Sequence, residues 1–349
     1  MRPLCDLNIE ELVATSEKYG QPKYRAKQIM RHIAAYDSFD EYTDLPKSFI
    51  AQLKEEYSDR PLTEVTRVTS SDGAVRYLFK TLNEDLIESV YLPHDYGNSV
   101  CVSAQVGCGM GCVFCASGKH GLVRNLSAGE ILSQVLHIAR EKRDNGGVNK
   151  IVMMGSGEPL ANYDNTVKFI KLVNSADGLN IGMRSISVST CGLPDKIVQL
   201  PDDGISCTLS LSLHAATDAK RKTIMKVAEK YSVDELVDAL KTYFDKTGRR
   251  VILEYILIDG FNDTKADVAD IKNLLKGLCC HVNLIPLNPT DNCSYMPPTK
   301  KRAYAFCDML NSAGVSASVR RSMGSDVAGA CGQLKNRTVE EKAKRNKKS

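Results

Sequence analysis

The sequence predicts an α/β fold: a partial (β/α)6 barrel with an N-terminal helical domain and a small β extension. The barrel is indicated by short apolar segments that alternate with amphipathic helical segments after Gly97, the pattern of parallel strands joined by crossover helices. It is also indicated by polar residues that follow several of these apolar segments, where the loops of a barrel converge on one mouth. The expected strands span residues 99–105, 150–155, 184–189, 207–213, 251–258, 281–286 and 316–321.

The first sixty residues are expected to be helical, because apolar side chains recur there at helical spacing. These apolar side chains are Ala26, Ile29, Met30, Ile33 and Ala34. Four cations stand between and beside them: Lys23, Arg25, Lys27 and Arg31. They form a basic surface that is either a contact for phosphates or an ordinary solvated face, and composition does not decide between the two.

A β-rich stretch follows the helices. Residues 74–80 and 86–92 have the β-branched and aromatic content of strands, with turns expected at 70–73 and 82–85. The last fifteen residues carry seven Lys or Arg against two Glu, a composition typical of a solvated disordered tail or of an arm that binds a polyanion. We therefore expect four parts, at residues 1–60, 61–96, 97–334 and 335–349.

The composition indicates what class of protein this is and in which cell compartment it works. A hydrophobic content of 43% is ample for a packed core, and no stretch approaches the roughly 20 apolar residues that span a bilayer. Twelve cysteines without an apolar N-terminal segment favour a reducing cytosol, where thiols serve metals or catalysis. We expect a cytoplasmic protein that does not enter a membrane.

Three cysteines form the most informative motif. Cys108, Cys112 and Cys115 have a CxxxCxxC spacing, which supplies three thiolates to a [4Fe-4S] cluster and leaves one iron without a protein ligand. Such clusters normally take four thiolates, so three predict that a small molecule binds the fourth iron. The alternative is a zinc site, but zinc sites favour CxxC pairs with a matching second pair downstream, which this chain lacks.

Polar residues recur where the expected strands end. They include the turn 155–159 with Glu158, the serines Ser187, Ser189, Ser210 and Ser212, and also His214 and Asn288. Any one of them alone is best interpreted as a cap or turn residue. Their shared position at the carboxyl ends of strands predicts a common site at the barrel mouth, where the glycines of the turn let backbone approach a ligand.

Seven runs of the sequence carry a resemblance to a known family. They are YRAKQI (24–29), CVSAQVGC (101–108), MGSGEPL (154–160), SVSTCG (187–192), LSLHA (211–215), HVNLIPLNP (281–289) and RRSMG with ACGQL (320–334). On these runs the chain resembles the RlmN/Cfr family of radical S-adenosylmethionine (SAM) methyltransferases, over nearly its whole length before the tail. The resemblance implies that residues 97–334 form a radical SAM barrel and that the cysteine triplet binds one [4Fe-4S] cluster.

The resemblance also assigns roles to further residues. It implies that Cys331 is a methyl carrier, that Cys101 is the thiol that forms a transient disulfide with Cys331, and that Glu88 is the proton acceptor. The SAM ligands that it implies are Gly157, Glu158, Ser189, Ser212, Leu213, His214 and Asn288, with Phe114 near the adenine. From the residues alone, Glu88 is by default a solvent-facing side chain of a strand.

The reaction that the resemblance implies uses two SAM molecules per turnover. One methylates Cys331, and the other is cleaved at the cluster to give a radical that activates the new methyl group. A transient protein–RNA adduct is then resolved by Cys101. The implied targets are carbon 2 of adenine 2503 in 23S rRNA and adenine 37 of some tRNAs. The implied partners are these RNAs and a reductant such as flavodoxin or ferredoxin, and the expected state is a monomer.

Two alternatives remain. Cfr-like methylation at carbon 8 uses the same parts, although the pairs Glu158-Pro159 and Cys191-Gly192 favour RlmN. A noncatalytic zinc protein that binds RNA is the alternative from another class. One departure from the family pattern stands at 226–228, where Lys-Val-Ala replaces the usual Pro-x-Asn. We expect this segment to lie away from the cluster and from Cys331.

Overall fold

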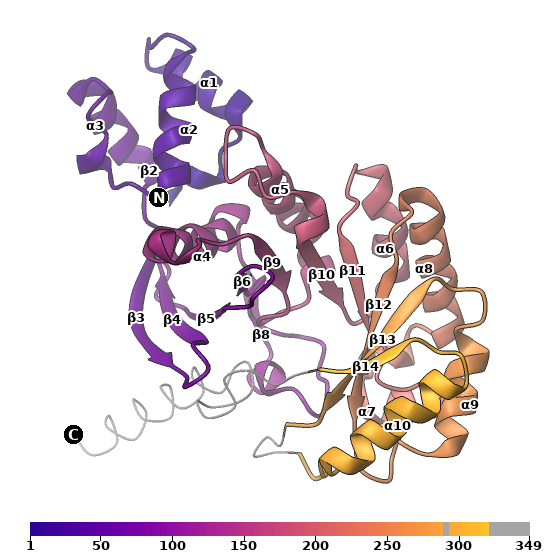
Figure 1. Ribbon diagram of the computed structural model, residues 1–349. Coiled ribbons are helices and arrows are strands. Elements are labelled where there is room, and N and C mark those ends of the chain that lie inside the picture. Colours follow the sequence, from indigo (N-terminus) through magenta and orange to yellow (C-terminus); the bar gives the residue numbers. More distant parts are fainter. Residues whose placement is uncertain (289–292, 321–349) are drawn as a thin grey trace.

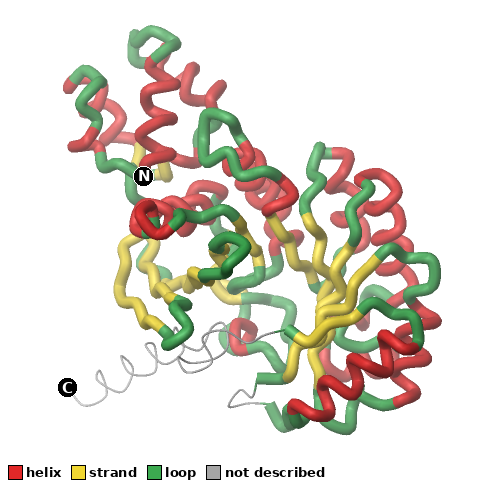
Figure 2. Tube along the Cα trace, viewed as in Figure 1, coloured by secondary structure: helices red, strands yellow, loops and turns green. Residues whose placement is uncertain are grey.

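The computed structural model describes residues 1–288 and 293–320. Its main element is a curved ten-stranded sheet in the order β14-β13-β12-β11-β10-β9-β6-β5-β4-β3 (Figures 1 and 2). Seven neighbouring strands are parallel: β6 (Ser99–Cys101), β9 (Lys150–Met153), β10 (Ile186–Thr190), β11 (Thr208–Ser212), β12 (Val251–Leu257), β13 (Cys280–Pro286) and β14 (Ala317–Val319). Because β14 and β3 are the two edges of this sheet, the predicted partial barrel is confirmed.

Crossover helices connect the parallel strands. They are α4 (Ala128–Glu141), α5 (Tyr163–Asn174), α6 (Pro194–Asp202), α7 (Asp218–Ile224), α8 (Val233–Thr247), α9 (Lys265–Leu274) and α10 (Lys300–Ser312). Figure 1 shows α6, α8 and α9 on the outer side of β10 to β13. Among the described helices, none combines the length and the apolar character that crossing a membrane requires.

The register of the strands gives the sheet one apolar and one polar face. Val188 lies opposite Leu209 on the next strand, and both are buried. The alternate residues are polar: Ser189 is opposite Ser210, and Ser212 is opposite Glu254. Because side chains alternate along a strand, these polar residues share the face turned away from the apolar side chains. The apolar face packs under the crossover helices, so the polar face lines the inside of the barrel.

Three antiparallel strands extend this same sheet. They are β3 (Leu62–Thr69), β4 (Val75–Thr81) and β5 (Leu86–Leu92), and β5 pairs with β6. The predicted strands at 74–80 and 86–92 are thus confirmed within one residue. The β3 strand was not predicted, because most of its side chains are exposed and polar. The residues expected to form a small extension therefore continue the barrel sheet without a break.

The N-terminal helices are α1 (Ile9–Lys18), α2 (Arg25–Ala35) and α3 (Lys47–Glu56). The short strands β1 (Arg2–Pro3) and β2 (Tyr57–Ser58) precede and follow these helices and pair with each other. Most cations of the expected basic surface have partners within this unit. Arg31 forms an ion pair with Asp44 at 3.2 Å, and Lys23 forms one with Glu17 at 3.4 Å. Arg25 donates to the carbonyl oxygen of Asp44. These contacts favour the interpretation of a solvated structural face.

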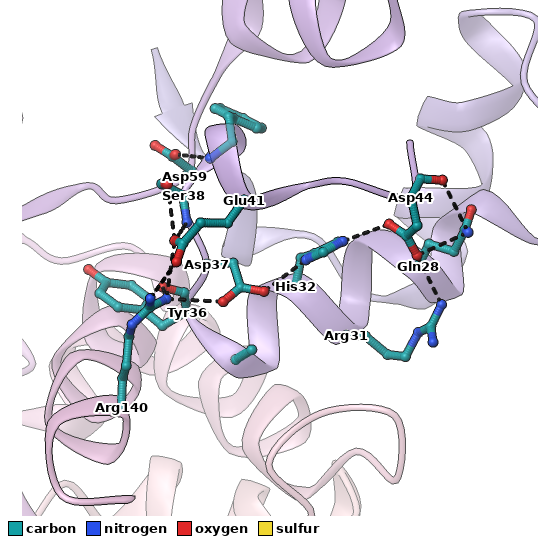
Figure 3. A network of polar contacts seen from close by, with 12 residues as sticks. Gln28, Arg31, His32, Tyr36, Asp37, Ser38, Glu41, Asp44, Asp59 and Arg140 are labelled. Atoms are coloured by element: carbon teal, nitrogen blue, oxygen red, sulfur yellow. Dashed lines mark hydrogen bonds and ion pairs between the residues drawn. The ribbon is translucent and has the colours of Figure 1, made fainter. Parts of the chain in front are cut away.

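A polar network fixes the N-terminal helices to the barrel (Figure 3). Arg140, on α4, donates to the carbonyl oxygen of Tyr36 at 2.6 Å and forms ion pairs with Asp37 and Glu41. His32 continues the network, because its two ring nitrogens contact Asp37 and Asp44. The N-terminal helices are therefore held against the outer side of the crossover helix that follows β8.

Candidate active site

The cysteine triplet lies in a loop between two short paired strands, β7 (Gln105–Gly107) and β8 (Leu122–Asn125). The expected strand at 99–105 therefore ends early, at Cys101. Gly107 has a φ of 79°, and a Cβ atom there would lie 2.1 Å from the carbonyl oxygen of Gly121. The same oxygen accepts from the backbone N–H of Cys108 at 3.0 Å. The glycine thus permits the close approach that starts the loop.

The environment of the thiols fits a cluster. Burial raises the pKa of Cys108 to about 11 and that of Cys112 to about 12, and negative charge on the neighbouring thiols adds to this effect. Backbone N–H groups of Met110 and Gly157 point at the Cys108 sulfur and act in the opposite direction. Thiolates gathered in such a site need a positive centre, which a bound metal cluster supplies.

The donor atoms of the cysteine triplet are not gathered as tightly as the ligands of a bound zinc ion. With Zn–S bonds of about 2.3 Å, tetrahedral ligands lie only about 3.8 Å apart. Among the described residues, the His, Cys, Asp or Glu triad whose donor atoms lie within 4.8 Å of one another is Glu64, His137 and Glu141, and not the cysteine triplet. That acidic triad already holds a cation, because Arg67 contacts both of its carboxylates.

The turn after β9 packs directly on the segment that leads to the cysteines. Gly157 has a φ of 102°, and a Cβ atom there would lie 2.5 Å from the Cβ of Gln105. Glu158 is only 3% exposed, and burial raises its pKa. Its two carboxylate oxygens accept from the backbone N–H groups of Leu160 at 3.0 Å and Cys191 at 2.7 Å. Glu158 therefore joins the ends of β9 and β10.

His214 and Phe114 meet at the end of β11. Their rings are perpendicular, with centroids 4.9 Å apart. The Nδ1 atom of His214 accepts from the backbone N–H of Ile256 at 3.1 Å. Burial and then the charge of Arg221 lower the pKa of His214 to about 3, so the imidazole is neutral and carries its proton on Nε2. The cysteine loop and the end of β11 are thus in contact.

The remaining expected SAM ligands occupy the same edge of the sheet. Ser189 and Ser212 are half-buried on the polar face of β10 and β11. Leu213 is buried, and its backbone N–H donates to the carbonyl oxygen of Glu254 at 3.0 Å. Asn288 is exposed and follows β13 by two residues. The structure therefore brings these side chains to the carboxyl ends of successive parallel strands.

Glu88 and Cys101 lie on neighbouring strands, β5 and β6. Cys101 is paired with Val90, so its side chain shares a face with Glu88, two residues away. Both residues are only 6% exposed, and Glu88 forms an ion pair with Arg76 at 3.3 Å. The default of a solvent-facing Glu88 is thus wrong, because the antiparallel strands extend the barrel interior. Cys331 lies outside the described residues.

Two residues near the cysteine loop were missed or misplaced from the sequence. Lys226 is not remote from the cluster loop, because a Cβ atom on Gly111 would lie 3.0 Å from its Cδ. Arg221, which the sequence motif did not single out, is fully buried beneath the ends of β10 and β11. No local pattern identifies either contact, since both depend on how α7 packs against the loop.

Family models match two parts of the chain. Residues 102–275 match the model described as the radical SAM superfamily. Residues 3–58 match the model described as the ribosomal RNA large subunit methyltransferase N-terminal domain. The first match spans the cysteine loop and the parallel strands β9 to β12, and the second spans the three N-terminal helices.

Individual relatives cover nearly the whole chain. A probable dual-specificity RNA methyltransferase RlmN from Clostridium perfringens (strain 13 / Type A) is 46% identical over 98% of this chain and 99% of the relative. One from Lachnoclostridium phytofermentans is 45% identical over 94% and 93%. The crystal structure of a radical SAM methyltransferase from Sphaerobacter thermophilus superposes with a TM-score of 0.92, at 41% identity over 95% of this chain and 99% of that one. The chain therefore belongs to the RlmN family of radical SAM RNA methyltransferases.

Proposed function

We propose that this protein methylates carbon 2 of adenine 2503 in 23S rRNA and of adenine 37 in some tRNAs. The observation that carries the proposal is the contact between the cysteine loop and the polar strand ends, through Phe114 and His214. A metal-bound cofactor and its protein ligands would share that space. The family relationship supplies the class of reaction, and the residues below supply its parts.

Membership of the radical SAM superfamily implies a [4Fe-4S] cluster and SAM. Cys108, Cys112 and Cys115 would hold the cluster, which supplies one-electron cleavage chemistry to a SAM molecule at its open iron. The backbone N–H groups directed at the Cys108 sulfur suit a cluster ligand, because hydrogen bonds to sulfur tune such centres. We propose two SAM molecules per turnover, the second of which methylates Cys331.

The proposed SAM ligands have matching chemistry. Neutral His214 offers an Nε2–H donor, and the hydroxyl groups of Ser189 and Ser212 stand on the same polar face. Gly157 brings backbone to the site, and the buried carboxylate of Glu158 suits an ammonium group by its charge. Backbone at Leu213, the side chain of Asn288 and the ring of Phe114 complete the proposed set.

Glu88 and Cys101 stand on the barrel face that a flipped base would enter. We assign Glu88 as the acceptor of the ring proton and Cys101 as the thiol that attacks the Cys331 sulfur to release methylated RNA. Their shared face and their burial support this pairing of roles, because one base could reach both side chains. An electron donor such as flavodoxin or ferredoxin would reduce the cluster, and external reduction of the Cys101–Cys331 disulfide would complete the cycle.

The proposed RNA grips are the N-terminal helices and the basic tail. Residues 1–60 form a helical accessory domain, and residues 335–349 supply a basic tail outside the described residues. Between them, residues 61–96 extend the sheet and residues 97–334 form the catalytic core. Because three of the four cations at 23–31 have partners within the protein, the tail is the stronger candidate for phosphate contacts. We propose a monomeric cytoplasmic enzyme.

Product analysis tests this proposal. RNA from cells that have or lack the gene is digested, and methylated adenosines are separated by mass spectrometry. We expect 2-methyladenosine that disappears in the deletion strain and returns with the wild-type gene but not with Cys331→Ala. A gene-dependent 8-methyladenosine would instead support the Cfr-like alternative, and no gene-dependent methylation would refute both.

A further inference from the structure

We propose that Arg221 is a fixed buried cation that raises the reduction potential of the cluster held by the three cysteines. The inference rests on the proposed cluster but concerns a residue to which no role has yet been given. Arg221 takes no part in bond making or breaking, and it would act on the cluster through its charge and position.

Arg221 is held rigidly. It lies on α7, whose first turn is capped by the Thr217 side chain, and its own side chain has no exposed surface. Its Nε donates to the carbonyl oxygen of Leu213 at 3.1 Å. One of its terminal nitrogens, Nη2, donates to the carbonyl oxygens of Ser212 and Cys191. The guanidinium is therefore fixed to the carboxyl ends of β10 and β11.

The other terminal nitrogen is left without a partner. Nη1 of Arg221 is buried and has no hydrogen bond within the described part of the chain. The described residues also give Arg221 no carboxylate within ion-pair distance: Asp218, the nearest acid along α7, accepts from the backbone N–H of Val233 instead. A buried cation without a counter-charge costs several kcal/mol, so such a group indicates an anionic partner that binds later.

The thiols next to Arg221 identify that partner. Burial lowers the pKa of Arg221, and the charges of the nearby Cys191 and Cys112 thiols act in the opposite direction. Cys112 belongs to the apolar group that packs around Cys191 and Ile224. The loop is also tied to α7, because the backbone N–H of Val113 donates to the carbonyl oxygen of Ile224 at 3.1 Å. Of these two thiols, Cys112 is the one expected to be a thiolate in the holoprotein.

A fixed cation at this place favours the reduced cluster. Reduction adds one negative charge to a centre that already has three thiolates, and a buried positive charge stabilises that extra charge strongly in a medium of low dielectric constant. Glu158 opposes the effect, because its charge acts on Cys108 and Cys112 with the other sign. The two side chains bind the backbone of the same residue: Glu158 accepts from the N–H of Cys191, and Arg221 donates to the carbonyl oxygen of Cys191.

Redox titration of the reconstituted holoprotein tests whether the charge of Arg221 raises the reduction potential of the cluster. We expect Arg221→Gln to shift the equilibrium between oxidised and reduced cluster at least tenfold towards the oxidised form, a potential lower by about 59 mV for one electron. Arg221→Lys, which keeps the charge, should shift it by less than Arg221→Gln. Lys222→Gln is the matched control, because this exposed neighbour on α7 also loses one positive charge. Equal shifts in the Arg221→Gln and Lys222→Gln variants would overturn the proposal.

A second measurement tests whether Arg221 lies next to the cluster, and it uses only proteins that keep the positive charge. Wild-type holoprotein labelled with ¹⁵N in the arginine guanidinium groups is reduced and studied by pulsed electron paramagnetic resonance. We expect a ¹⁵N coupling to the cluster that Arg221→Lys abolishes. A paramagnetic cluster without this coupling would refute the role of Arg221 alone, whereas wild-type protein that binds no iron would refute the proposed function itself.

Discussion

The ring of Phe114 meets the imidazole of His214 edge to face, with ring centroids 4.9 Å apart. Phe114 comes from the cysteine loop and His214 from the end of β11. This contact therefore joins the loop proposed to bind the cluster to a strand end proposed to bind SAM. Aromatic rings favour this geometry, which positions His214 together with its bond from Ile256. The orientation leaves Nε2 of the neutral imidazole as the donor for a ligand.

The neutrality of His214 predicts a pH-dependent stability. Its pKa is about 3 in the folded protein and about 6.5 in the unfolded chain, so the unfolded state binds more protons between these values. The folded state therefore has the full stability that neutral His214 allows above pH 6.5, and it loses this stability as the pH falls towards 3. By pH 5 the loss from this group is about 2 kcal/mol. Unfolding of the apoprotein by urea at pH 5, 6 and 7 should show a steeper decline for wild type than for His214→Gln, and equal slopes would contradict the account.

A glycine at position 157 is predicted to be required for the turn after β9 to pack against Gln105. Gly157→Ala places a methyl group 2.5 Å from the Cβ of Gln105, at a φ of 102°. Gly204→Ala is a matched control, because Gly204 also has a positive φ, of 79°, but has no atom within 4 Å of the added Cβ. We expect Gly204→Ala to cost about 1–2 kcal/mol and Gly157→Ala clearly more, with loss of bound iron. Thermal melting and iron analysis measure both effects, and similar losses in the two variants would refute the steric argument.

The network around Arg140 predicts how firmly the N-terminal helices are held. Arg140 lowers the pKa of Glu41 to about 2, so this ion pair is present above the unfolded pKa of about 4.5 and is lost as the pH falls towards 2. We expect Arg140→Gln to speed proteolysis between residues 36 and 61 by about fivefold, which corresponds to about 1 kcal/mol for a partly exposed pair. Lys54→Gln removes an exposed pair with Asp40 and should change little. Equal cleavage rates in the two variants would contradict the role of Arg140.

The parallel strands could be predicted from the sequence because they are buried. The predicted segment at 251–258, for example, is β12 at Val251–Leu257, which is apolar and almost wholly buried apart from its one charged residue, Glu254. Strand β3 escaped prediction because its exposed, polar residues give it little hydrophobic signal. The strand predicted at 99–105 was too long, because it ends at Cys101. The segment that follows instead makes contacts with the distant Gln134 and Glu88.

The candidate site was predicted in part for a similar reason. The cysteine spacing and the turn at Glu158 are local, so they can be read along the chain. Arg221 carries no such signal, because its significance comes from three carbonyl oxygens at the ends of two strands. The position of Lys226 beside Gly111 likewise depends on tertiary packing. Sequence patterns therefore located the reactive groups but not the side chains that surround them.

Iron content and SAM cleavage together test the central claim that three cysteines hold an incompletely ligated cluster. Wild type, Cys112→Ala and Cys279→Ala are purified without oxygen, reconstituted with iron and sulfide, and incubated with SAM and a strong reductant. Cys279 is an exposed cysteine outside the site, so its variant is the control. The account predicts brown protein with about four irons per chain and reductive SAM cleavage for wild type and Cys279→Ala, and neither property for Cys112→Ala. Colourless wild-type protein that binds zinc, or undiminished SAM cleavage by Cys112→Ala, would contradict it.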